Sequence, residues 1–491
     1  MSMCLCLPPE PDTRSGFRRL PQRTRRIAVY VNRMTLTPPG AAAPTSQERR
    51  RVIAATTIGT AIEWYDYFLY AAVAGLVFKE VMFAPLGPAA ATIVSFLTVG
   101  LSFLFRPLGA VLAGHFADKV GRRTVLMVTL FGMGLATTLI GLLPTYATAG
   151  WLAPALLIFL RIVQGISAGG EWGSAVLMAV EHAPVNKRGL YGAGPQVGVP
   201  AGLLLSSAAL ALVNAIAPGE AFMQWGWRVP FLFSLVLMLV GWWIRTGVDE
   251  SPVYTEMAAD RAHEAANPLG VLFRRHFPLV LAAALAFAAN SAVGYMTTGG
   301  FVQNYVTNPE GLAIPRGDIL WAVTASAAVW MLSTAFAGWL SDYWGRTHTL
   351  AMGFIVQAVG VGLLFPLVNT GDLAKIYFAL IFLSLGIGLT YGQIAALFAE
   401  LFPASVRASG ASISYALGAI LGGAFAPTIA ASLYEATGGT RAITVYLLVM
   451  TTIGFLVALA LRERKGIALG HDNEAQQAVG HFVWQKAPVT L

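Results

Sequence analysis

A ten-residue segment occurs twice in this chain, and the repeat constrains its fold more than any other feature. The first copy, residues 114–123, reads GHFADKVGRR, and the second copy, residues 338–347, reads GWLSDYWGRT. The two copies share Gly, Asp, Gly and Arg in the same register. A repeat at nearly half the chain length indicates two related halves built on one plan.

The composition indicates that most of the chain lies in a membrane. Hydrophobic residues make up 56% of the chain and charged residues only 11%, whereas about a quarter of the residues in soluble domains are charged. So few charges cannot cover a water-exposed surface, so most of the outer surface must face lipid. The apolar runs are continuous rather than alternating, which argues against a spanning β-barrel.

The apolar runs predict an all-α integral membrane protein with twelve transmembrane helices in two six-helix, pseudo-symmetric halves. A polar connector, residues 247–276, separates the halves 51–246 and 277–462. Each copy of the repeat then joins the second and third helices of its half. The predicted helices are 52–78, 89–113, 124–144, 152–180, 189–213, 226–246, 277–302, 318–339, 349–369, 374–398, 408–434 and 441–461.

Lysine and arginine are distributed unevenly between the loops on the two sides of the predicted bundle. An excess of these residues marks the cytoplasmic side of a membrane protein, so we expect both termini in the cytoplasm and the chain in the cell's inner or plasma membrane. The richer side holds Lys119, Arg122, Arg123, Lys187, Arg188, Arg261, Arg274, Arg275, Arg346 and Arg407, and the poorer side holds Lys79, Arg316, Lys375 and Arg441.

The two ends of the chain differ from its apolar body. Residues 1–50 are rich in Arg and Pro without an apolar run, so we expect a disordered basic tail and no secretory signal. Their Arg-rich start resembles an organelle transit peptide, but we favour the interpretation that Met34 is the true start. Residues 463–491 are expected to form a short cytoplasmic tail. The two cysteines, Cys4 and Cys6, give no disulfide framework or metal site in the membrane body.

The net charge of +8 does not indicate nucleic-acid binding, because the basic residues lie in loops and tails rather than on one face. The apolar body instead makes the lipid bilayer the main partner of the chain. No sequence feature predicts a cofactor, and we expect the protein to act as a monomer on protons and a small-molecule substrate.

The first predicted helix carries two carboxylates three residues apart, Glu63 and Asp66, with Tyr67 and Tyr70 on the same face. Charges inside a membrane are costly and usually functional. Two carboxylates this close in a low dielectric cannot both ionise cheaply, so one of them is expected to take up a proton near neutral pH. The pair therefore indicates proton coupling; the alternative is neutralisation by fixed salt bridges.

Two arginines, Arg106 in the second predicted helix and Arg161 in the fourth, need anions because a guanidinium keeps its charge. The candidate partners are Glu63, Asp66, Glu171 and an anionic substrate. We assign Arg161 and Glu171 to proton coupling and Arg106 to substrate binding, because competition among these partners would couple the two events. A purely structural pairing is the alternative.

Uncharged polar residues at membrane depth are further candidates for a central substrate site. They can also simply hydrogen-bond helices to one another. Besides Tyr67 and Tyr70, the candidates are Gln164, Gln196, Asn290, Tyr295, Tyr391, Gln393 and Tyr415.

The repeated loop has a different predicted role, which we call the cytoplasmic latch. Its Asp can favour a helix N-terminus, and its Arg can reach carboxylates or helix ends opposite, so such contacts can form and break as the halves rock. The alternative is that these residues only anchor the loops on the cytoplasmic side. The latch residues are Gly114, Asp118, Gly121, Arg122 and Arg123 in the first half, and Asp342, Arg346, Glu400 and Arg407 in the second.

These motifs together resemble the major facilitator superfamily, whose hallmark is the Gly-x-x-x-Asp-x-x-Gly-Arg-Arg loop. Within it the chain resembles the metabolite:proton symporter family over residues 52–462, most of all its shikimate-type members. The matching segments are 63–67 (EWYDY), 106–109 (RPLG), 161–165 (RIVQG), 169–173 (GGEWG), 227–231 (WRVPF), 250–252 (ESP) and 399–403 (AELFP) with Arg407.

The resemblance implies uptake of a small carboxylate, a shikimate-like acid or a zwitterionic osmolyte together with protons. Two departures stand out. The second loop ends in Thr347 instead of a second Arg, which weakens its latch, and residues 463–491 lack the coiled-coil heptads found in many osmolyte-transporting members.

The sequence thus predicts a secondary active transporter that imports a small organic solute by proton symport through alternating access. Proton-coupled efflux is the first alternative, and a transporter-like receptor that binds solute without moving it is the second. An intramembrane enzyme is disfavoured because no metal cluster or activated nucleophile occurs at membrane depth: His115, His182, His276 and His348 fall in loops or at helix ends.

Overall fold

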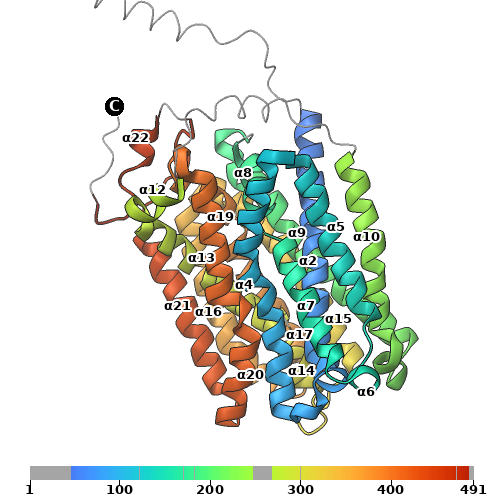
Figure 1. The fold of residues 1–491 in the computed structure, drawn as a ribbon. Helices are drawn as coiled ribbons and strands as arrows, with labels where there is room; N and C mark the ends of the chain where they lie inside the picture. Colours follow the sequence, from blue (N-terminus) through green and yellow to red (C-terminus); the bar gives the residue numbers. More distant parts are fainter. Residues whose placement is uncertain are drawn as a thin grey trace, which may run out of the picture. The chain divides into compact units, whose positions relative to one another are not determined.

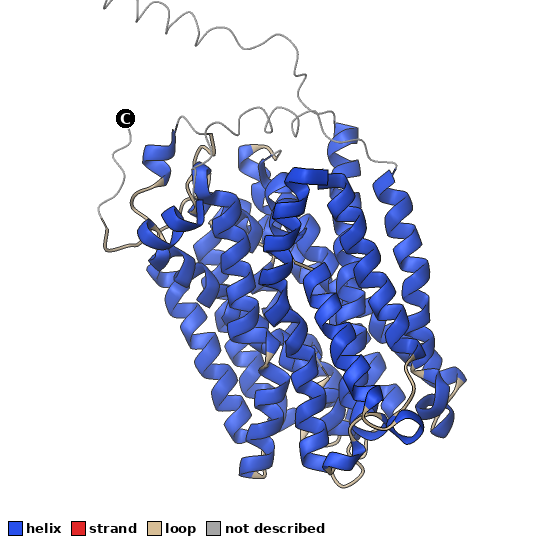
Figure 2. Ribbon diagram, in the orientation of Figure 1, coloured by secondary structure: helices blue, strands red, loops and turns tan. Residues whose placement is uncertain are grey.

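The computed structural model describes residues 46–120, 122–169, 171–181, 183–246, 268–298, 300–470 and 473–485. Its regular elements in these ranges are helices, joined by short turns (Figures 1 and 2). One isolated antiparallel bridge, between Leu461 and Phe482, is the exception. Of the predicted tail 1–50, residues 1–45 lie outside the described ranges, as does most of the predicted connector.

Six helical passes precede the connector. Several are interrupted by a π-helical turn or a short break, which divides one apolar segment into two labelled helices. The elements are α2 (Ser46–Val73) with η2 (Ala74–Phe78) and α3 (Lys79–Val81), α4 (Pro88–Val120), α5 (Arg122–Leu142), α6 (Tyr146–Ala149), α7 (Leu152–Ser167) with α8 (Glu171–Glu181), α9 (Arg188–Ile216), and η5 (Phe222–Gly226) with α10 (Arg228–Thr246).

Six more passes follow the connector, after a short amphipathic helix and before a C-terminal segment. The elements are α12 (Pro268–Arg275), α13 (Phe277–Thr298) with α14 (Phe301–Thr307), α15 (Arg316–Trp344), α16 (Arg346–Val368), α17 (Leu373–Tyr391) with α18 (Ile394–Leu401), α19 (Arg407–Gly418) with η8 (Ala419–Ala424) and α20 (Ala426–Thr437), α21 (Arg441–Ala460), and α22 (Glu474–Gln477).

Each of the twelve predicted apolar segments coincides with one of these helices or with consecutive ones. Nine helices of the described residues are long and apolar enough to cross a membrane. The other three segments are α2 with η2, whose apolar stretch carries Glu63 and Asp66, and the shorter apolar helices Met127–Leu142 and Leu152–Ser167. The predicted all-α membrane fold is confirmed.

Small residues let the helices of the two halves touch backbone to backbone at both ends of the bundle. At one end α9 packs on α15, and a Cβ on Gly338 would lie 2.7 Å from the carbonyl oxygen of Gly189. At the other end a Cβ on Gly75 would lie 2.6 Å from the carbonyl oxygen of Gly300, whose φ of 95° suits glycine. The structure is therefore closed at both ends.

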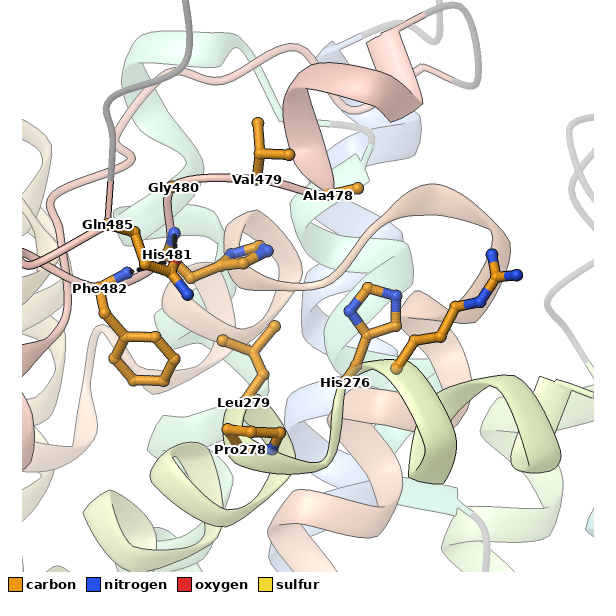
Figure 3. Close-up of a pocket in the computed structure, with 10 residues that line it drawn as sticks. His276, Pro278, Leu279, Ala478, Val479, Gly480, His481, Phe482 and Gln485 are labelled. Carbon is orange, nitrogen blue, oxygen red and sulfur yellow. Dashed lines mark hydrogen bonds between the residues drawn. The ribbon is translucent and has the colours of Figure 1, made fainter.

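The segment after α21 folds back onto the bundle instead of leaving it. The Arg462 N–H donates to the His481 carbonyl at 2.8 Å, and the Val483 N–H donates to the Ala460 carbonyl at 3.0 Å. Between this segment and the start of α13 lies a cavity of about 360 Å³. Figure 3 shows His481 on the tail side of the cavity and His276, Pro278 and Leu279 on the helix side.

His481 is buried in a strongly basic environment. Its Nδ1 contacts the Arg464 guanidinium, and its backbone N–H donates to Gln485 Oε1 at 2.9 Å. Burial, the Arg464 charge and, to a smaller extent, His276 lower the pKa of His481 to about 4, against a hydrogen bond to the backbone of Ala478 that raises it. Burial and Arg275 also lower the pKa of His276, while Glu474 raises it.

We predict that docking of this C-terminal segment weakens in acid. A His481 pKa depressed from 6.5 to about 4 means that the docked state binds fewer protons than the released state between these values. Its stability is therefore complete above pH 6.5 and falls as the pH drops toward 4. Hydrogen exchange of residues 473–485 should accelerate from pH 7.5 to 5.5, after correction for intrinsic exchange rates.

The dependence should become weaker in His481→Gln and persist in His348→Gln, whose imidazole is 69% exposed. Equal pH dependence in all three proteins would show that His481 does not cause it.

Candidate functional site

The two carboxylates of α2 are both buried, at 7% exposure for Glu63 and 2% for Asp66. The Glu63 Oε1 atom lies 3.3 Å from Arg106 Nη2, so an ion pair joins α2 to α4. One member of the predicted carboxylate pair thus has a cationic partner of the kind that the sequence suggested. This pairing neutralises two charges that would otherwise be costly at membrane depth.

Asp66 is held differently, by hydroxyl groups. Its Oδ2 accepts from Thr137 Oγ1 of α5 at 2.8 Å, and its Oδ1 accepts from Ser234 Oγ of α10 at 2.7 Å. No arginine or lysine nitrogen of the described residues lies within 4.0 Å of this carboxylate. Hydroxyl groups, unlike a guanidinium, stabilise a carboxylate without fixing its charge.

The hydroxyl of Thr137 allows Asp66 to exist in two protonation states. Thr137 has one hydrogen, which reaches either Asp66 Oδ2 or the Met133 carbonyl, 3.0 Å away. With Asp66 ionised, Thr137 donates to the carboxylate. With Asp66 protonated, the acid can donate to Thr137, which then donates to Met133 as its second bond. Both states are satisfied without moving a helix.

Arg161, from α7, is buried at 2% exposure and meets neutral acceptors. It donates to the carbonyls of Thr98 and Val99 and to Ser102 Oγ, at 3.1, 2.9 and 2.8 Å, and its guanidinium carbon lies 3.8 Å from the centre of the Tyr70 ring. The anion expected for Arg161 is therefore not among the described side chains within ion-pair distance.

A chain of hydrogen bonds connects Arg161 to Asp66. Arg161 Nη1 donates to Gln164 Oε1 at 2.7 Å, and Gln164 Nε2 donates to Thr137 Oγ1 at 2.7 Å. Thr137 bonds Asp66 in turn. The candidate proton-binding carboxyl and the buried guanidinium thus belong to one network across α2, α5 and α7.

A cavity of about 20 Å³, large enough for about one water molecule, lies where these groups meet. It brings together the four charged residues that the sequence singled out in α2, α4 and α7. Its lining residues are Glu63, Asp66, Tyr67, Ser102, Arg106, Met133, Arg161, Gln164 and Ala168.

An aromatic cluster covers Arg106 on the side of the second half. The Arg106 guanidinium lies 4.4 Å from the centre of the Phe103 ring and 5.4 Å from that of Trp64. Tyr295 of α13 packs on the same rings, 5.6 Å from each and 5.4 Å from Tyr67. The Tyr67 hydroxyl and Arg106 Nε have no hydrogen-bond partner within the described ranges, so unused donors face this cluster.

A second cluster joins the halves closer to the repeated loops. Trp172 of α8 stacks on Tyr415 of α19 at 3.6 Å and donates to Gln196 Oε1 of α9 at 2.9 Å. The hydroxyls of Tyr415 and Tyr391 lie 3.1 Å apart, and Phe287 stacks on Tyr415 at 4.1 Å. These contacts bring Gln196, Tyr391 and Tyr415, three of the candidates for a substrate site, into one cluster.

The remaining candidates have separate environments, of which only that of Tyr70 adjoins the charged network. Asn290 bonds the Thr390 hydroxyl and the Ile387 carbonyl, at 2.6 and 3.0 Å, which links α13 to α17. Gln393 donates to the carbonyl of Leu389 one turn before it, at 3.0 Å. Tyr70 bonds Thr98 at 2.6 Å beneath Arg161. Glu171 begins α8, but its side chain lies outside what the structure describes.

The second-half latch forms an ionic network at the end of the bundle where Gly189 meets Gly338. Asp342 accepts from the backbone N–H groups of Gly189 and Leu190, at 2.8 and 2.9 Å, at the N-terminus of α9. Such a carboxylate satisfies orphan donors and favours the positive end of the helix dipole. One residue of the second half thereby holds a helix of the first.

Further ion pairs surround that contact. Arg346 bonds Asp342 at 2.8 Å and Glu400 at 3.0 Å, and Arg188 of the first half lies 3.5 Å from Glu400. Arg407 lies 3.3 Å from Glu181. Asp342, Arg346 and Glu400, three of the predicted second-half latch residues, thus share one network, and Arg407 pairs separately with Glu181.

The first-half latch is not described to the same extent. Gly114 and Asp118 fall within α4, and Arg122 and Arg123 begin α5. Their side-chain environments, and the whole of Gly121, lie outside the described residues.

Comparison with known proteins identifies the family. The model of the Major Facilitator Superfamily matches residues 56–414 and 301–489. The chain belongs to the Major Facilitator Superfamily. This family consists of transporters, so the chain is a membrane transporter of small molecules and not an enzyme.

Curated relatives match along nearly their whole length. The Inner membrane metabolite transport protein YhjE of Escherichia coli K12 is 39% identical over 85% of this chain and 95% of its own length. The Shikimate transporter of Escherichia coli K12 is 36% identical over 84% of this chain and 94% of its own. The Proline/betaine transporter of Salmonella typhimurium LT2 is 29% identical, over 84% and 83%.

A solved structure shows the same fold. The proton:xylose symporter XylE bound to 6-bromo-6-deoxy-D-glucose superimposes with a TM-score of 0.67, covers 87% of this chain and 98% of its own, and is 17% identical. Identity this low supports the fold alone.

Three functional candidates escaped the sequence: Thr137, Ser234 and Trp172. Their signal is weak, because a lone hydroxyl in an apolar helix usually bonds its own backbone. Trp172 lies within the matched segment 169–173, but nothing in that segment indicates that it stacks across the halves.

We predict that Glu63→Gln lowers the thermal stability of the detergent-solubilised protein, because it leaves the Arg106 charge buried without its ion-pair partner. Breaking a buried pair costs about 3 kcal/mol, and the melting midpoint should fall accordingly. Asp372→Asn is the matched control: its partner Lys375 lies 3.8 Å away and both side chains are about half exposed, so its effect should stay below about 1 kcal/mol. Equal midpoints for both variants would contradict the assignment.

Proposed function

We propose that this transporter imports a small organic anion together with a proton by alternating access between its halves, residues 51–246 and 277–462. The observation that carries the proposal is the shared cavity of Asp66, Glu63, Arg106 and Arg161. It combines a carboxyl that can gain or lose a proton with a guanidinium that a substrate anion can reach.

Asp66 is the proposed proton-binding residue. Its buried, hydroxyl-bound carboxyl accepts a proton without breaking an ion pair, since no described cation lies within ion-pair distance of it. Glu63 is the second candidate, because protonation would release it from Arg106. Arg161 and Gln164 are the proposed positioning residues, since they hold Thr137 against Asp66.

Net charge gives a physical reason for coupling. When all four residues are ionised, two carboxylates and two guanidinium groups sum to zero. Protonation of Asp66 leaves the site with one excess positive charge in a low dielectric, where an anion is strongly attracted. By thermodynamic reciprocity, the bound anion stabilises the proton to the same extent.

The aromatic cluster favours an organic anion with an apolar or ring face. The substrate carboxylate is proposed to pair with Arg106 and to use its free Nε and the free Tyr67 hydroxyl. Trp64, Phe103 and Tyr295 would cover the rest of the molecule. The relatives named for metabolite and shikimate transport are 36–39% identical, against 29% for the proline/betaine transporter, which also favours an organic anion over a zwitterion.

The second-half latch is proposed to close the cytoplasmic end. The excess of Lys and Arg in the loops at that end supports this orientation, with both termini in the cytoplasm. Transporters of this type bind substrate near the middle of the membrane between the halves, which is where Tyr295 meets the aromatic residues of the first half. We expect each monomer to contain a complete site.

We predict that purified protein in proteoliposomes accumulates a labelled shikimate-type acid when the lumen is alkaline. Asp66→Asn should abolish uptake driven by the pH gradient but keep counterflow exchange, because a fixed neutral residue still allows the loaded carrier to turn over. Glu435→Gln, an exposed carboxylate-to-amide change, is the matched control and should behave as the unsubstituted protein.

Uptake that ignores the imposed gradient would refute symport. Solute leaving vesicles against its own gradient in exchange for protons would favour efflux, and binding without counterflow would favour a receptor.

We also predict that binding of a carboxylate ligand tightens as the pH falls. Ligand that binds only folded protein raises its melting midpoint, so the shift produced by shikimate-type acids should grow from pH 8 to pH 6. In Asp66→Asn the shift should be large and independent of pH, since the site keeps its excess positive charge. A shift in that variant that still varies with pH would assign the proton to another residue.

A further inference from the structure

The chain after α21 crosses the latch and contacts both halves. The Gly466 N–H donates to Glu400 Oε1 at 3.3 Å. The Ile467 carbonyl accepts from Arg188 Nη1 at 2.6 Å. Arg188 belongs to α9 of the first half and Glu400 to α18 of the second. Two consecutive residues thus contact opposite sides of the closed end.

Further contacts fix this segment to the second half. Lys465 Nζ donates to the carbonyls of Asp342 and Tyr343, at 3.2 and 2.9 Å. The Leu469 carbonyl accepts from Arg407 Nη2 at 3.0 Å. We call residues 463–470 the strap. In Figure 1 the short helix α22, which follows the strap, lies at the same end as α8 and α12.

The buried Gln477, at 1% exposure, fixes the strap through hydrogen bonds to its backbone. Its Nε2 donates to the Ala468 and Gly470 carbonyls, both at 2.8 Å. Its Oε1 accepts from Arg407 Nη2 at 3.1 Å and from the Ala404 N–H at 2.7 Å. A single amide therefore ties the strap to a latch arginine.

Glu463 binds Thr347, the residue that stands where the first copy of the repeated loop has its second arginine. Its Oε2 accepts from both the backbone N–H and the hydroxyl of Thr347, each at 2.9 Å, at the N-terminus of α16. Gly345 allows this approach, because a Cβ there would lie 2.7 Å from the Glu463 carboxyl carbon. Thr347, which the sequence suggested would weaken the latch, is therefore an anchor for the strap.

We propose that the strap is a third component of the cytoplasmic latch, with Glu463 as its positioning residue. This inference rests on the alternating-access cycle proposed above. Opening the cytoplasmic end parts α9 from α15, which breaks the Ile467–Arg188 bond, whereas the bonds to Thr347, Glu400 and Arg407 lie within the second half. The docked strap thus stabilises the closed state and slows opening toward the cytoplasm.

Hydrogen exchange at two backbone amides measures opening of the latch directly. The Gly189 and Leu190 N–H groups are bonded to Asp342 only while the end is closed, so their hydrogen exchange in lipid nanodiscs measures opening without substrate or proton gradient. We predict that Glu463→Ala raises exchange at these amides about fivefold, the change typical of losing one helix N-terminal partner. Exchange of residues 463–470 should rise as well.

Matched variants separate the strap from general destabilisation. Glu463→Gln keeps an oxygen that can accept from Thr347, so it should restore most of the protection. Lys465→Ala removes the bonds to Asp342 and Tyr343 and should act in the same direction as Glu463→Ala. If Glu463→Ala does not fold, exchange at Gly189 and Leu190 in Lys465→Ala tests the proposal instead. Exchange across Gly75 and Gly300, at the opposite end, should not increase in any variant.

Exchange that rises in the strap but not at Gly189 and Leu190 would overturn the proposal, and so would no change in either. Because this readout needs no transport, an unsuccessful uptake assay would reject the proposed function while leaving the strap result intact. Exchange that rises equally everywhere would also overturn it, since the strap would then only support the fold.

Discussion

The cost of an ionised side chain in a low dielectric is the constraint on which this structure depends. The charged side chains around one small cavity are stabilised in three different ways. Glu63 and Arg106 neutralise each other, Arg161 is satisfied by backbone carbonyls, a hydroxyl, an amide and an aromatic face, and Asp66 is satisfied by hydroxyls alone. The last arrangement lets a proton neutralise the charge without breaking an ion pair, which is why Asp66 is the first candidate proposed for proton coupling.

The two ends of the bundle are closed by different forces. At the latch end the contact between glycines is reinforced by a network of Asp342, Arg346, Glu400 and Arg188. At the other end Gly75 and Gly300 touch, and the principal polar bond between halves is from Lys79 to Asn304, at 2.6 Å. The ions of this network are buried in the closed state, at 1–7% side-chain exposure, so the closure is reversible only if opening brings them into contact with water.

The sequence predicted the helices well because each is an apolar run long enough to cross a membrane. It named Glu63 as one of several candidate partners of Arg106, because buried charges require partners. It could not predict Thr137 and Ser234, which lie 71 and 168 residues from Asp66. Thr137 also bonds its own helix, as any threonine in an apolar helix would. The strap could not be predicted either, because most of its contacts use backbone carbonyls, which every residue type has.

Helix α9 provides a physical connection between the proposed proton site and the latch. Its N-terminus is held by Asp342, and Gln196, two turns further on, bonds Trp172 of the cluster between the halves. Beyond that, a Cβ on Gly202 would lie 2.6 Å from the Tyr65 nitrogen and one on Gly198 2.6 Å from the Thr57 carbonyl oxygen, so α9 and α2 touch along their backbones. Close-packed backbones cannot slide independently. A shift of α2 on release of Glu63 from Arg106 would therefore be passed on to α9, and with it to the amides that Asp342 holds.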